Sequence, residues 1–540
     1  MPTLHWIGKD KVINHHQDVP YKILEPQYTF VDGKENNSTI SENKIIHGDN
    51  LEALKSLLPE YEGRIKCIYI DPPYNTGNEG WIYNDNVNDS KIKKWLGQVV
   101  GKESDDLTRH DKWLCMMYPR IKLLQKLLAS DGLIFMSLDD NELENGLHLL
   151  NEIFGKKNKL ACAPWLAEPS GGKEKTKLRN GHEYVLIYSN GDSSGITQEE
   201  RSAGTLNLKD KWGKYKKGRE LRKWGGTSLR EDRPGQWFPL KTQTGEEVYP
   251  YRNDGKEGHW RWGEKQKMKP IIDDLEVAHW ELCSYDSGVI VNGETERWVP
   301  FEKIRDSKKM VGWTTWLNSV GYNSDGTEVL KSIFGSKLFD TPKPVSLIEW
   351  LISLHDDNDG IVLDSFAGSG TTAHAVLNLN KQDGGSRKFI LIEMEDYANT
   401  ITAERVKRVI KGYGNDSKPI EGTDGDFTFY KLGEPIFLDN DLLNETIGVE
   451  RINEYVWFSE TKSKYCKQIE DCLLGVKEQT AYYFYYDKNK ATTLSESFLR
   501  QIKTKAEQYI IYADNCLLEE NLMSKYHIIF KKIPRDITRF

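Results

Sequence analysis

The first part of the chain alternates between helix-like and strand-like spacing of its hydrophobic positions. Asp49 or Asn50 can cap a helix whose leucines at 51, 54 and 58 share one face. Apolar residues at spacings of three and four then predict a second helix over 114–128. Short continuous apolar runs predict buried strands at 65–70, 133–138 and 183–188.

The same alternation returns later in the chain. Helices are expected at 345–354, 371–379 and 400–411, and strands at 361–364 and 388–393. Between the two regions the periodicity is lost, and nine of the sixteen tryptophans lie at 212–316. Strand–helix alternation predicts a parallel sheet with right-handed crossovers, here interrupted by an insertion.

Five segments follow from this pattern. They are an N-terminal segment (1–40), the first half of a Rossmann-like α/β sheet (41–192), an inserted domain (193–335), the second half of the sheet (336–434) and a mixed C-terminal domain (435–540). In the last segment, the aromatic run 482–486 predicts a core or interface strand.

Composition narrows the class of protein. The 540 residues are 38% hydrophobic and 29% charged, which is typical of a folded globular chain. No apolar stretch approaches the roughly 18–20 residues of a membrane span, and the N-terminus has no signal-peptide core. Seven scattered cysteines without a C-x-x-C pair argue against a disulfide framework or a zinc ribbon. We expect a soluble, cytoplasmic protein that does not contact a membrane.

The strand at 65–70 leads into Asp71-Pro72-Pro73-Tyr74. Ligands of open parallel sheets bind beyond the carboxyl ends of the strands, so Asp71 is expected at the floor of a site. A carboxylate beside the Pro72 carbonyl offers two acceptors for the two N–H donors of an amino group, and Tyr74 offers a stacking face. A plain strand-ending turn explains these four letters equally well.

A second strand runs into Phe366-Ala367-Gly368-Ser369-Gly370, a glycine turn that opens a helix. Glycines let the backbone approach a ligand closely, and helix N-termini present N–H groups. The next predicted strand ends in Glu393, about where a nucleotide-type site places its ribose-binding carboxylate. Glu395 is an alternative for that role, and an ordinary tight turn is the alternative for the glycines.

These two segments together resemble the amino-methyltransferases that modify DNA bases with S-adenosylmethionine. Asp71–Tyr74 resembles their catalytic motif and 366–370 their methyl-donor motif. Because the catalytic motif comes first, the order resembles the circularly permuted β class, in which a target-recognition region lies between the two. The Trp-rich insertion at 193–335 takes that position.

Further segments narrow the resemblance to the modification subunits of type III restriction-modification systems. They are DPPYNTGNEGWIYND, WLCMMYPRIKLL, SDGLIFMSLDDNE, SGGKEKTKLRNGHEYVLIY and RWGEKQKM. Gly48-Asp49-Asn50 resembles the segment that meets the donor's adenine, and Asp340–Pro344 resembles the segment that covers its methionine end.

The resemblance implies transfer of a methyl group to adenine N6 in double-stranded DNA, with the base flipped out of the helix. Asp rather than Ser before Pro-Pro-Tyr favours adenine over cytosine N4. The implied catalytic residues are Asp71, Pro72, Pro73 and Tyr74. The implied donor-binding residues are Asp49, Asn50, Lys343, Asp364, Phe366, Ala367, Gly368, Ser369, Gly370, Thr371 and Glu393.

Net charge qualifies the expectation of a DNA partner. The whole chain carries −8, but residues 209–233 hold ten basic and four acidic residues, a local net of +6. Such a stretch is typical of phosphate contact, although a solvated basic face has the same composition. The candidate DNA-binding residues are Lys214, Lys216, Lys217, Arg219, Arg222 and Lys223.

The resemblance also implies a homodimer and a separate restriction subunit, with residues 435–540 as a contact region. Alternatives are an orphan or cytosine-N4 methyltransferase, and a DNA specificity subunit without activity. Trp165 or Tyr184 is a candidate second wall for the base, with a core position as the alternative. His182-Glu183 and His15-His16 have no third ligand at suitable spacing, so no metal site is predicted.

Overall fold

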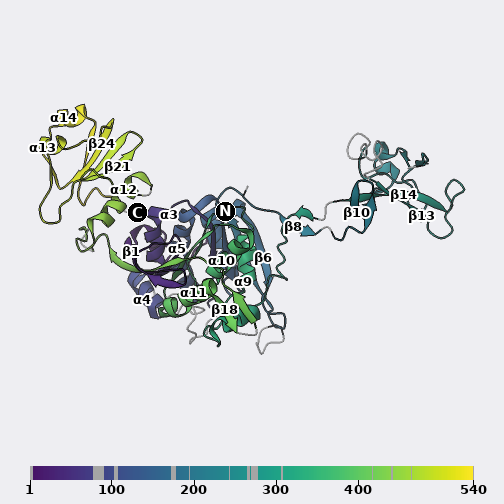
Figure 1. Ribbon diagram of the computed structural model, residues 1–540, viewed down its shortest axis with the longest axis horizontal. Helices are drawn as coiled ribbons and strands as arrows, with labels where there is room; N and C mark the ends of the chain where they lie inside the picture. The colour runs from purple at the N-terminus through teal and green to yellow at the C-terminus, as the bar shows by residue number, and fades with distance from the viewer. Residues whose placement is uncertain are drawn as a thin grey trace. The chain divides into compact units, whose positions relative to one another are not determined.

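The computed structural model describes residues 4–76, 90–102, 108–171, 178–193, 195–202, 204–242, 244–263, 268, 278–305, 308–415, 418–438, 442–463 and 465–538. The chain divides into two compact units. The first is formed by Met1–Thr197 with Thr314–Phe540, and the second by Gln198–Trp313. The two are described separately below (Figure 1).

The first unit is built on a ten-stranded sheet. Its spatial order is β2 (Lys34–Asn36), β1 (Lys22–Val31), β20 (Phe427–Pro435), β3 (Lys44–His47), β17 (Lys388–Glu393), β16 (Ile361–Asp364), β4 (Ile65–Ile70), β5 (Leu128–Leu138), β7 (His182–Ser189) and β6 (Lys159–Leu166). The strands from β20 to β5 are parallel, and the pairs at either end are antiparallel.

The sheet joins the two halves of the sequence pattern. β4, from the first half, pairs in parallel with β16, from the second, with Leu363 opposite Ile68. Nearly every residue of β4, β16 and β17 is buried, so both faces of these strands are covered, as parallel sheets require. The predicted α/β class with a parallel sheet is confirmed. In the chain, β4, which leads into Asp71, precedes β16, which leads into the glycine turn.

Helices cover the sheet. α3 (Asn50–Tyr61) and α5 (Arg109–Leu127) pack together in one core cluster with alternate strand residues such as Ile68, Ile70 and Ile390. α10 (Thr371–Asp383) packs on α9 (Val345–Ile352), α11 (Glu404–Lys411) and β17. Other helices of this unit are α1 (Lys9–Val12), α2 (His15–Asp18), α4 (Ser90–Val99), α6 (Leu143–Leu150) and α8 (Asn323–Phe334). β18 (Gly412–Asn415) pairs with β19 (Lys418–Glu421).

Two expected segment boundaries differ from the structure. The segment 1–40 is not separate, because β1 hydrogen-bonds to β20 and extends the main sheet. The second unit ends at Trp313 rather than at 335, since α8 lies in the first unit and contacts α11. Its Gly326 lies so close to Pro342 that an added Cβ would be 2.1 Å from the Pro342 carbonyl oxygen.

The second unit contains a four-stranded sheet in the order β13 (Ala278–Ser284), β14 (Glu296–Ile304), β10 (Gly213–Glu220) and β9 (Leu208–Asp210). β8 (Glu199–Ser202) pairs with β15 (Lys308–Val311), and β11 (Leu240–Lys241) with β12 (Glu247–Val248). Trp260 is fully buried in a small core with Leu221 and Leu240. Part of the tryptophan enrichment of this region therefore supports a small hydrophobic core.

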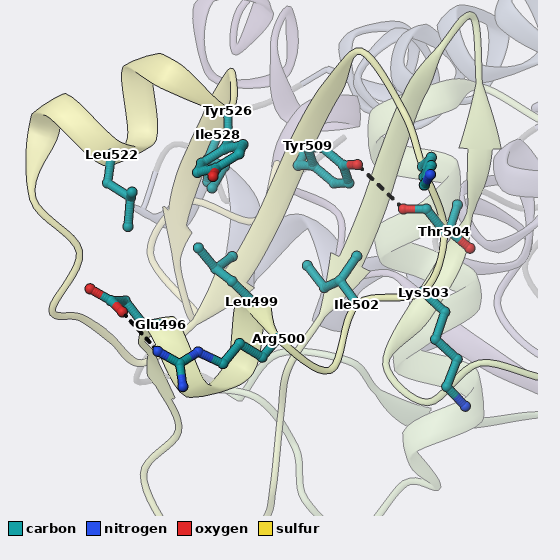
Figure 2. Close-up of a pocket in the computed structure, with 11 residues that line it drawn as sticks. Glu496, Leu499, Arg500, Ile502, Lys503, Thr504, Tyr509, Leu522, Tyr526 and Ile528 are labelled. Atoms are coloured by element: carbon teal, nitrogen blue, oxygen red, sulfur yellow. Dashed lines mark hydrogen bonds and ion pairs between the residues drawn. The ribbon is translucent and has the colours of Figure 1, made fainter.

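The C-terminal part follows β20. A sheet of β21 (Leu473–Lys477), β22 (Thr480–Phe484), β24 (Gln508–Ala513) and β26 (Ile528–Lys532) packs on α12 (Val449–Thr461), and the rest is α13 (Glu496–Leu499), α14 (Glu520–Lys525) and the pair β23 (Thr493–Leu494) and β25 (Asn515–Cys516). The predicted aromatic strand is largely β22. A cavity of about 440 Å³ lies between α13, α14 and β24 (Figure 2). Among the described residues, no helix is both long and apolar enough to cross a membrane.

Candidate active site

The carboxyl ends of neighbouring parallel strands place four sequence motifs at one edge of the sheet. β4 ends before Asp71, β16 ends at Asp364 and β17 ends at Glu393. β3 leads into Gly48, whose N–H donates to the Glu393 carbonyl at 3.0 Å. The predicted catalytic and donor-binding segments therefore meet at the edge where open α/β sheets bind ligands.

The turn after β4 is rigid and buried. Asp71 is 6% exposed and Tyr74 8% exposed. The Trp113 indole Nε1 donates to the Pro73 carbonyl at 2.7 Å and fixes the far side of the turn. Asp71 Oδ1 has no hydrogen-bond partner in the described part of the chain. A buried, unpartnered acceptor is costly, so this oxygen is suited to receive a donor from a ligand.

Lys343 lies on the catalytic side as well as on the donor side of this edge. Its ammonium Nζ is 3.0 Å from Asp71 Oδ2 and 3.4 Å from Glu183 Oε2. Its carbonyl accepts a hydrogen bond from Thr371 Oγ1 at 3.4 Å. Lys343 thus contacts Asp71 of one motif and Thr371 beside the glycine turn of the other, whereas the sequence predicted it only as a residue that binds the methyl donor.

The Asp49-Asn50 pair begins α3. Asp49 Oδ1 accepts the N–H groups of Leu51 and Glu52 at 2.9 and 3.1 Å, so Asp49 is the helix cap. Asn50 Nδ2 donates to the Ser365 carbonyl at 3.2 Å, which ties this loop to the one after β16. Arg120, buried on α5, donates from Nε to Asn50 Oδ1 at 2.5 Å.

The glycine turn is held from the strand ends below it. Asp364 Oδ1 accepts the Phe366 N–H at 3.0 Å, and its Oδ2 accepts the Thr372 hydroxyl at 2.5 Å. Gly368 and Gly370 have φ of +51° and +82°, the left-handed region that favours glycine. Glu393 Oε2 accepts the Gly368 N–H at 2.7 Å, so this N–H points to the next strand.

Two of these carboxyls are strongly perturbed. Burial raises the pKa of Asp364 to about 7, against the hydrogen bond from Thr372. Burial likewise raises the pKa of Glu393 to about 7, although the Glu395 and Gly368 N–H groups lower it. Carboxyls with such pKa values in a cleft are typical of functional sites.

Asp71, Lys343, Asp364, Phe366, Ala367, Ser369 and Thr371 line one cavity with the segment 339–342. These acids, hydroxyls and an aromatic ring fit a nucleoside-type ligand with an amino acid end, and Asp71 Oδ1, which lines the cavity, is buried without a partner among the described residues. The cavity measures about 20 Å³. That is room for about one water, so a nucleoside requires a wider opening than this cavity offers.

Three site residues escaped the sequence analysis. Arg405 is fully buried and donates from Nη1 to Ser369 Oγ and Thr371 Oγ1, both at 2.8 Å. Arg120 holds Asn50, as described above. Glu183 accepts the Tyr74 hydroxyl at 2.7 Å. Glu183 lies at the start of β7, which is two strands from β4 in the sheet, and this predicted strand was the signal that could have found it. The two arginines gave no signal, because in the sequence they resemble surface positions of amphipathic helices.

The predicted basic patch on the second unit is partly neutralised internally. Lys217 Nζ is 2.8 Å from Glu281, and Arg219 is 3.6 Å from Glu302. Arg222 is 3% exposed and lies 2.7 Å from Glu220, so it is a buried structural ion pair and is withdrawn as a phosphate contact. The other expected contacts, Lys214 and Lys216 on β10 and Lys223 beyond it, have no acid within ion-pair distance in the described chain.

Other expectations fall as follows. Trp165 is fully buried and donates to the Gly321 carbonyl at 2.8 Å, which is the core position given as its alternative. The Tyr184 hydroxyl is hydrogen-bonded to His182 Nε2, at 2.8 Å. Within the described residues, no cluster of His, Cys, Asp and Glu is arranged to hold a metal ion. Three parts of the quoted segments lie outside the described residues, namely 77–85, 172–177 and 264–267.

Known proteins are similar in sequence to this chain. The DNA methylase family model matches residues 65–404. The EcoPI Mod subunit of a type III restriction-modification enzyme, from Escherichia phage P1, is 31% identical over 76% of this chain and 68% of its own length. The type II methyltransferase M.KpnI of Klebsiella pneumoniae is 34% identical over 65% of this chain and 80% of its own.

The chain belongs to the DNA methylase family. The StyLTI Mod subunit of Salmonella typhimurium, also of type III, is 28% identical over 80% of this chain and 66% of its own length. The predicted resemblance to type III modification subunits is therefore confirmed, and the match spans about two thirds of those subunits.

Proposed function

We propose that the chain transfers a methyl group from S-adenosylmethionine to adenine N6 in double-stranded DNA, as the modification and recognition subunit of a type III restriction-modification system. One observation carries the proposal. The unpartnered carboxylate oxygen of Asp71 lies at the end of β4, directly beside the glycine turn that follows β16. An amine acceptor and a nucleoside-binding turn on adjacent strands suit a methyl transfer between two ligands.

Asp71 and Pro72 act on the target amine. An exocyclic amine is a poor nucleophile because its lone pair is delocalised into the ring. Asp71 Oδ1 and the Pro72 carbonyl accept its two N–H bonds, and no described residue donates to either oxygen in the free protein. Two acceptors fixed on a proline turn favour a pyramidal nitrogen whose lone pair points at the methyl group.

The donor side is formed by the loops after β3, β16 and β17. S-adenosylmethionine, when bound, supplies a methyl group on a positively charged sulfur that is already reactive. The residues that would hold it are Asp49, Asn50, Asp364, Phe366, Ala367, Gly368, Ser369, Gly370, Thr371 and Glu393, with Lys343 reaching the catalytic side. Their role is to orient the donor toward Asp71, since alignment of two reactants removes much of the entropic barrier.

DNA contacts both units of the chain. The target amine is inaccessible in a stacked duplex, so the base leaves the helix and stacks on Tyr74, at a cost of a few kcal/mol for unstacking. The lysines of β10 contact phosphates. Adenine is favoured over cytosine because Asp, rather than Ser, precedes Pro-Pro-Tyr.

A homodimer and a separate restriction subunit complete the proposal. Residues 435–540 are the contact region, and the cavity shown in Figure 2 supports this. Its walls include Leu499, Leu522 and Ile528, and its rim carries Arg500 and Lys503. Light scattering of the purified chain tests the dimer, with a Leu522→Asp variant expected to weaken it.

Long-read sequencing that detects modified bases tests the function directly. DNA from cells that express the chain alone is compared with DNA from cells that express Asp71→Ala. We expect N6-methyladenine at one short sequence in the first sample and none in the second. Modified cytosine at that sequence would favour the cytosine-N4 methyltransferase instead. DNA without any new modification would favour the specificity subunit without activity.

A further inference from the structure

Glu183 reaches the active site because of the antiparallel pairing of β7. In the register of β5 and β7, Tyr184 lies opposite Leu138, the last residue of β5. The start of β7 therefore lies at the same edge of the sheet as the carboxyl ends of the parallel strands. The Glu183 side chain is 15% exposed and points into the site described above.

Glu183 contacts residues from three other parts of the fold. Its Oε2 accepts the Tyr74 hydroxyl at 2.7 Å and lies 3.4 Å from Lys343 Nζ. Its Oε1 accepts Nδ2 of Asn323, at the start of α8, at 3.1 Å. Tyr74 precedes the inserted unit in the chain, whereas Asn323 and Lys343 follow it, so one carboxylate connects both halves of the sheet at the site.

Lys343 lies between two carboxylates and an aromatic ring. Its side chain is 8% exposed, and its ammonium lies 3.0 Å from Asp71 Oδ2 and 4.8 Å from the centre of the Tyr74 ring. A buried lysine stays charged only when acceptors surround it, and Asp71 and Glu183 provide them. Asp71 therefore has one oxygen occupied by Lys343 and the other, Oδ1, without a partner among the described residues.

We propose that Lys343 and Glu183 are positioning residues for the target base. Lys343 holds Asp71 Oδ2, so that the carboxylate cannot rotate and Oδ1 remains directed to the amine. Glu183 holds both the ammonium of Lys343 and the hydroxyl of Tyr74, which fixes the ring on which the base stacks. This inference rests on the proposed methyl transfer and adds two residues, one of them unassigned by the sequence motifs.

The charges around Asp71 give the proposal a measurable consequence. Burial raises the pKa of Asp71, Lys343 lowers it and Glu183 raises it. The other ionisable groups that face this cluster are Tyr69, Tyr74, Asp364 and Asp139. Asp71 accepts N–H bonds with both oxygens only when it is ionised, so the rate falls on the acid side of its pKa.

The test is the pH profile of kcat/KM for DNA in Lys343→Met and Glu183→Gln. Loss of the ammonium raises the pKa of Asp71, so the acid limb of the Lys343→Met profile moves to higher pH by about one to two units. Loss of the Glu183 charge lowers that pKa, so the Glu183→Gln limb moves to lower pH. Lys343→Arg, which keeps the charge, is expected to leave the limb in place.

If the two residues have only a structural role, the acid limbs of Lys343→Met and Glu183→Gln shift by the same amount or do not shift. Either result overturns the inference. A rise only in the KM for the methyl donor in Lys343→Met, with an unchanged limb, also overturns it and assigns Lys343 to the donor alone. If the wild-type protein transfers no methyl group, the proposed function itself is wrong. This result is distinct from the failure of the positioning roles, in which the wild type is active.

A second measurement follows the Tyr74 contact. 2-Aminopurine at the target position becomes fluorescent when the base leaves the stack. We expect Tyr74→Phe and Glu183→Leu each to weaken this signal, and the double variant to lose less than the sum, because both remove the same hydrogen bond. Fully additive losses would show that Glu183 does not act through Tyr74.

Discussion

Arg405 Nη1 donates a 2.8 Å hydrogen bond to Ser369 Oγ from beneath the glycine turn. The guanidinium is fully buried, and burial lowers its pKa to about 10, which leaves it charged at neutral pH. The turn that is proposed to hold the donor therefore rests on a buried cation from α11. Such a contact fixes the turn before any ligand binds.

Arg405→Met is expected to weaken donor binding and to destabilise the fold. The substitution leaves the hydroxyls of Ser369 and Thr371 without their donor, at a cost of about 1–3 kcal/mol each. Calorimetric titration with S-adenosylmethionine and thermal unfolding measure the two effects. Arg408→Met on the same helix, where the side chain is 41% exposed, is the control and is expected to change little. Equal effects of the two variants would contradict the role of Arg405.

The buried acids predict how stability depends on pH. The pKa of Asp364 is about 7 in the folded chain and 3.8 ordinarily. Because the folded state holds this proton more tightly, the free energy of unfolding falls as pH rises from about 4 to about 7, by at most about 1.4 kcal/mol per pH unit. Glu393, with a pKa of about 7, has the same sign.

Urea unfolding at several pH values checks this dependence. Asp364→Asn removes the ionisable group, so its unfolding midpoint is expected to change less between pH 5 and 7.5 than that of the wild type. Asp396→Asn, at an exposed position after β17, serves as the control. If Asp364→Asn kept the full pH dependence, the high folded-state pKa would be refuted.

The lysines of β10 predict a salt-dependent DNA affinity. Lys214→Glu with Lys216→Glu is expected to reduce the affinity for DNA and to lower the slope of log affinity against log salt by about two. Fluorescence anisotropy at several salt concentrations measures both quantities. The same charge change at Lys488 and Lys490, exposed in the C-terminal part, is the control. An unchanged slope in the β10 variant would remove this strand from the DNA interface.

Arg222 is expected to matter for folding rather than for DNA. Its pair with Glu220 has side-chain exposures of 3% and 9%, and removal of one member leaves a buried charge. Arg222→Ala should therefore destabilise the second unit by about 3–5 kcal/mol. Limited proteolysis measures the change, with Arg219→Ala, 63% exposed, as the control. Normal protease resistance of Arg222→Ala would restore it as a candidate phosphate contact.

Local patterns predicted the centre of the sheet well. The runs that became β4, β16 and β17 are continuous and apolar because both faces of a parallel strand are buried. β1 was missed because its middle carries Glu25, Pro26 and Gln27, and its pairing with β20 and β2 makes it a strand. Hydrophobic spacing therefore predicted β4, β16 and β17 but not every buried strand, since β3, which lies between β20 and β17, was missed as well.

The site was predicted as far as contiguous motifs reach. Asp71–Tyr74 and the glycine turn are each written in a few adjacent residues. Glu183, Arg120 and Arg405 are single charged residues. Their partners at the site lie at least 34 positions away, so only the tertiary structure brings them there. Lys343 was found through the donor motif, but its contact with Asp71 depends on the meeting of the two halves of the sheet.

The most direct test of the account is transfer of a labelled methyl group from S-adenosylmethionine to DNA, with the modified nucleoside identified by mass spectrometry. Wild type and Asp71→Ala are compared, and donor binding is measured on both by calorimetry. We predict N6-methyladenine from the wild type alone, with similar donor affinity for both proteins. Transfer by Asp71→Ala at a rate near that of the wild type would contradict the account.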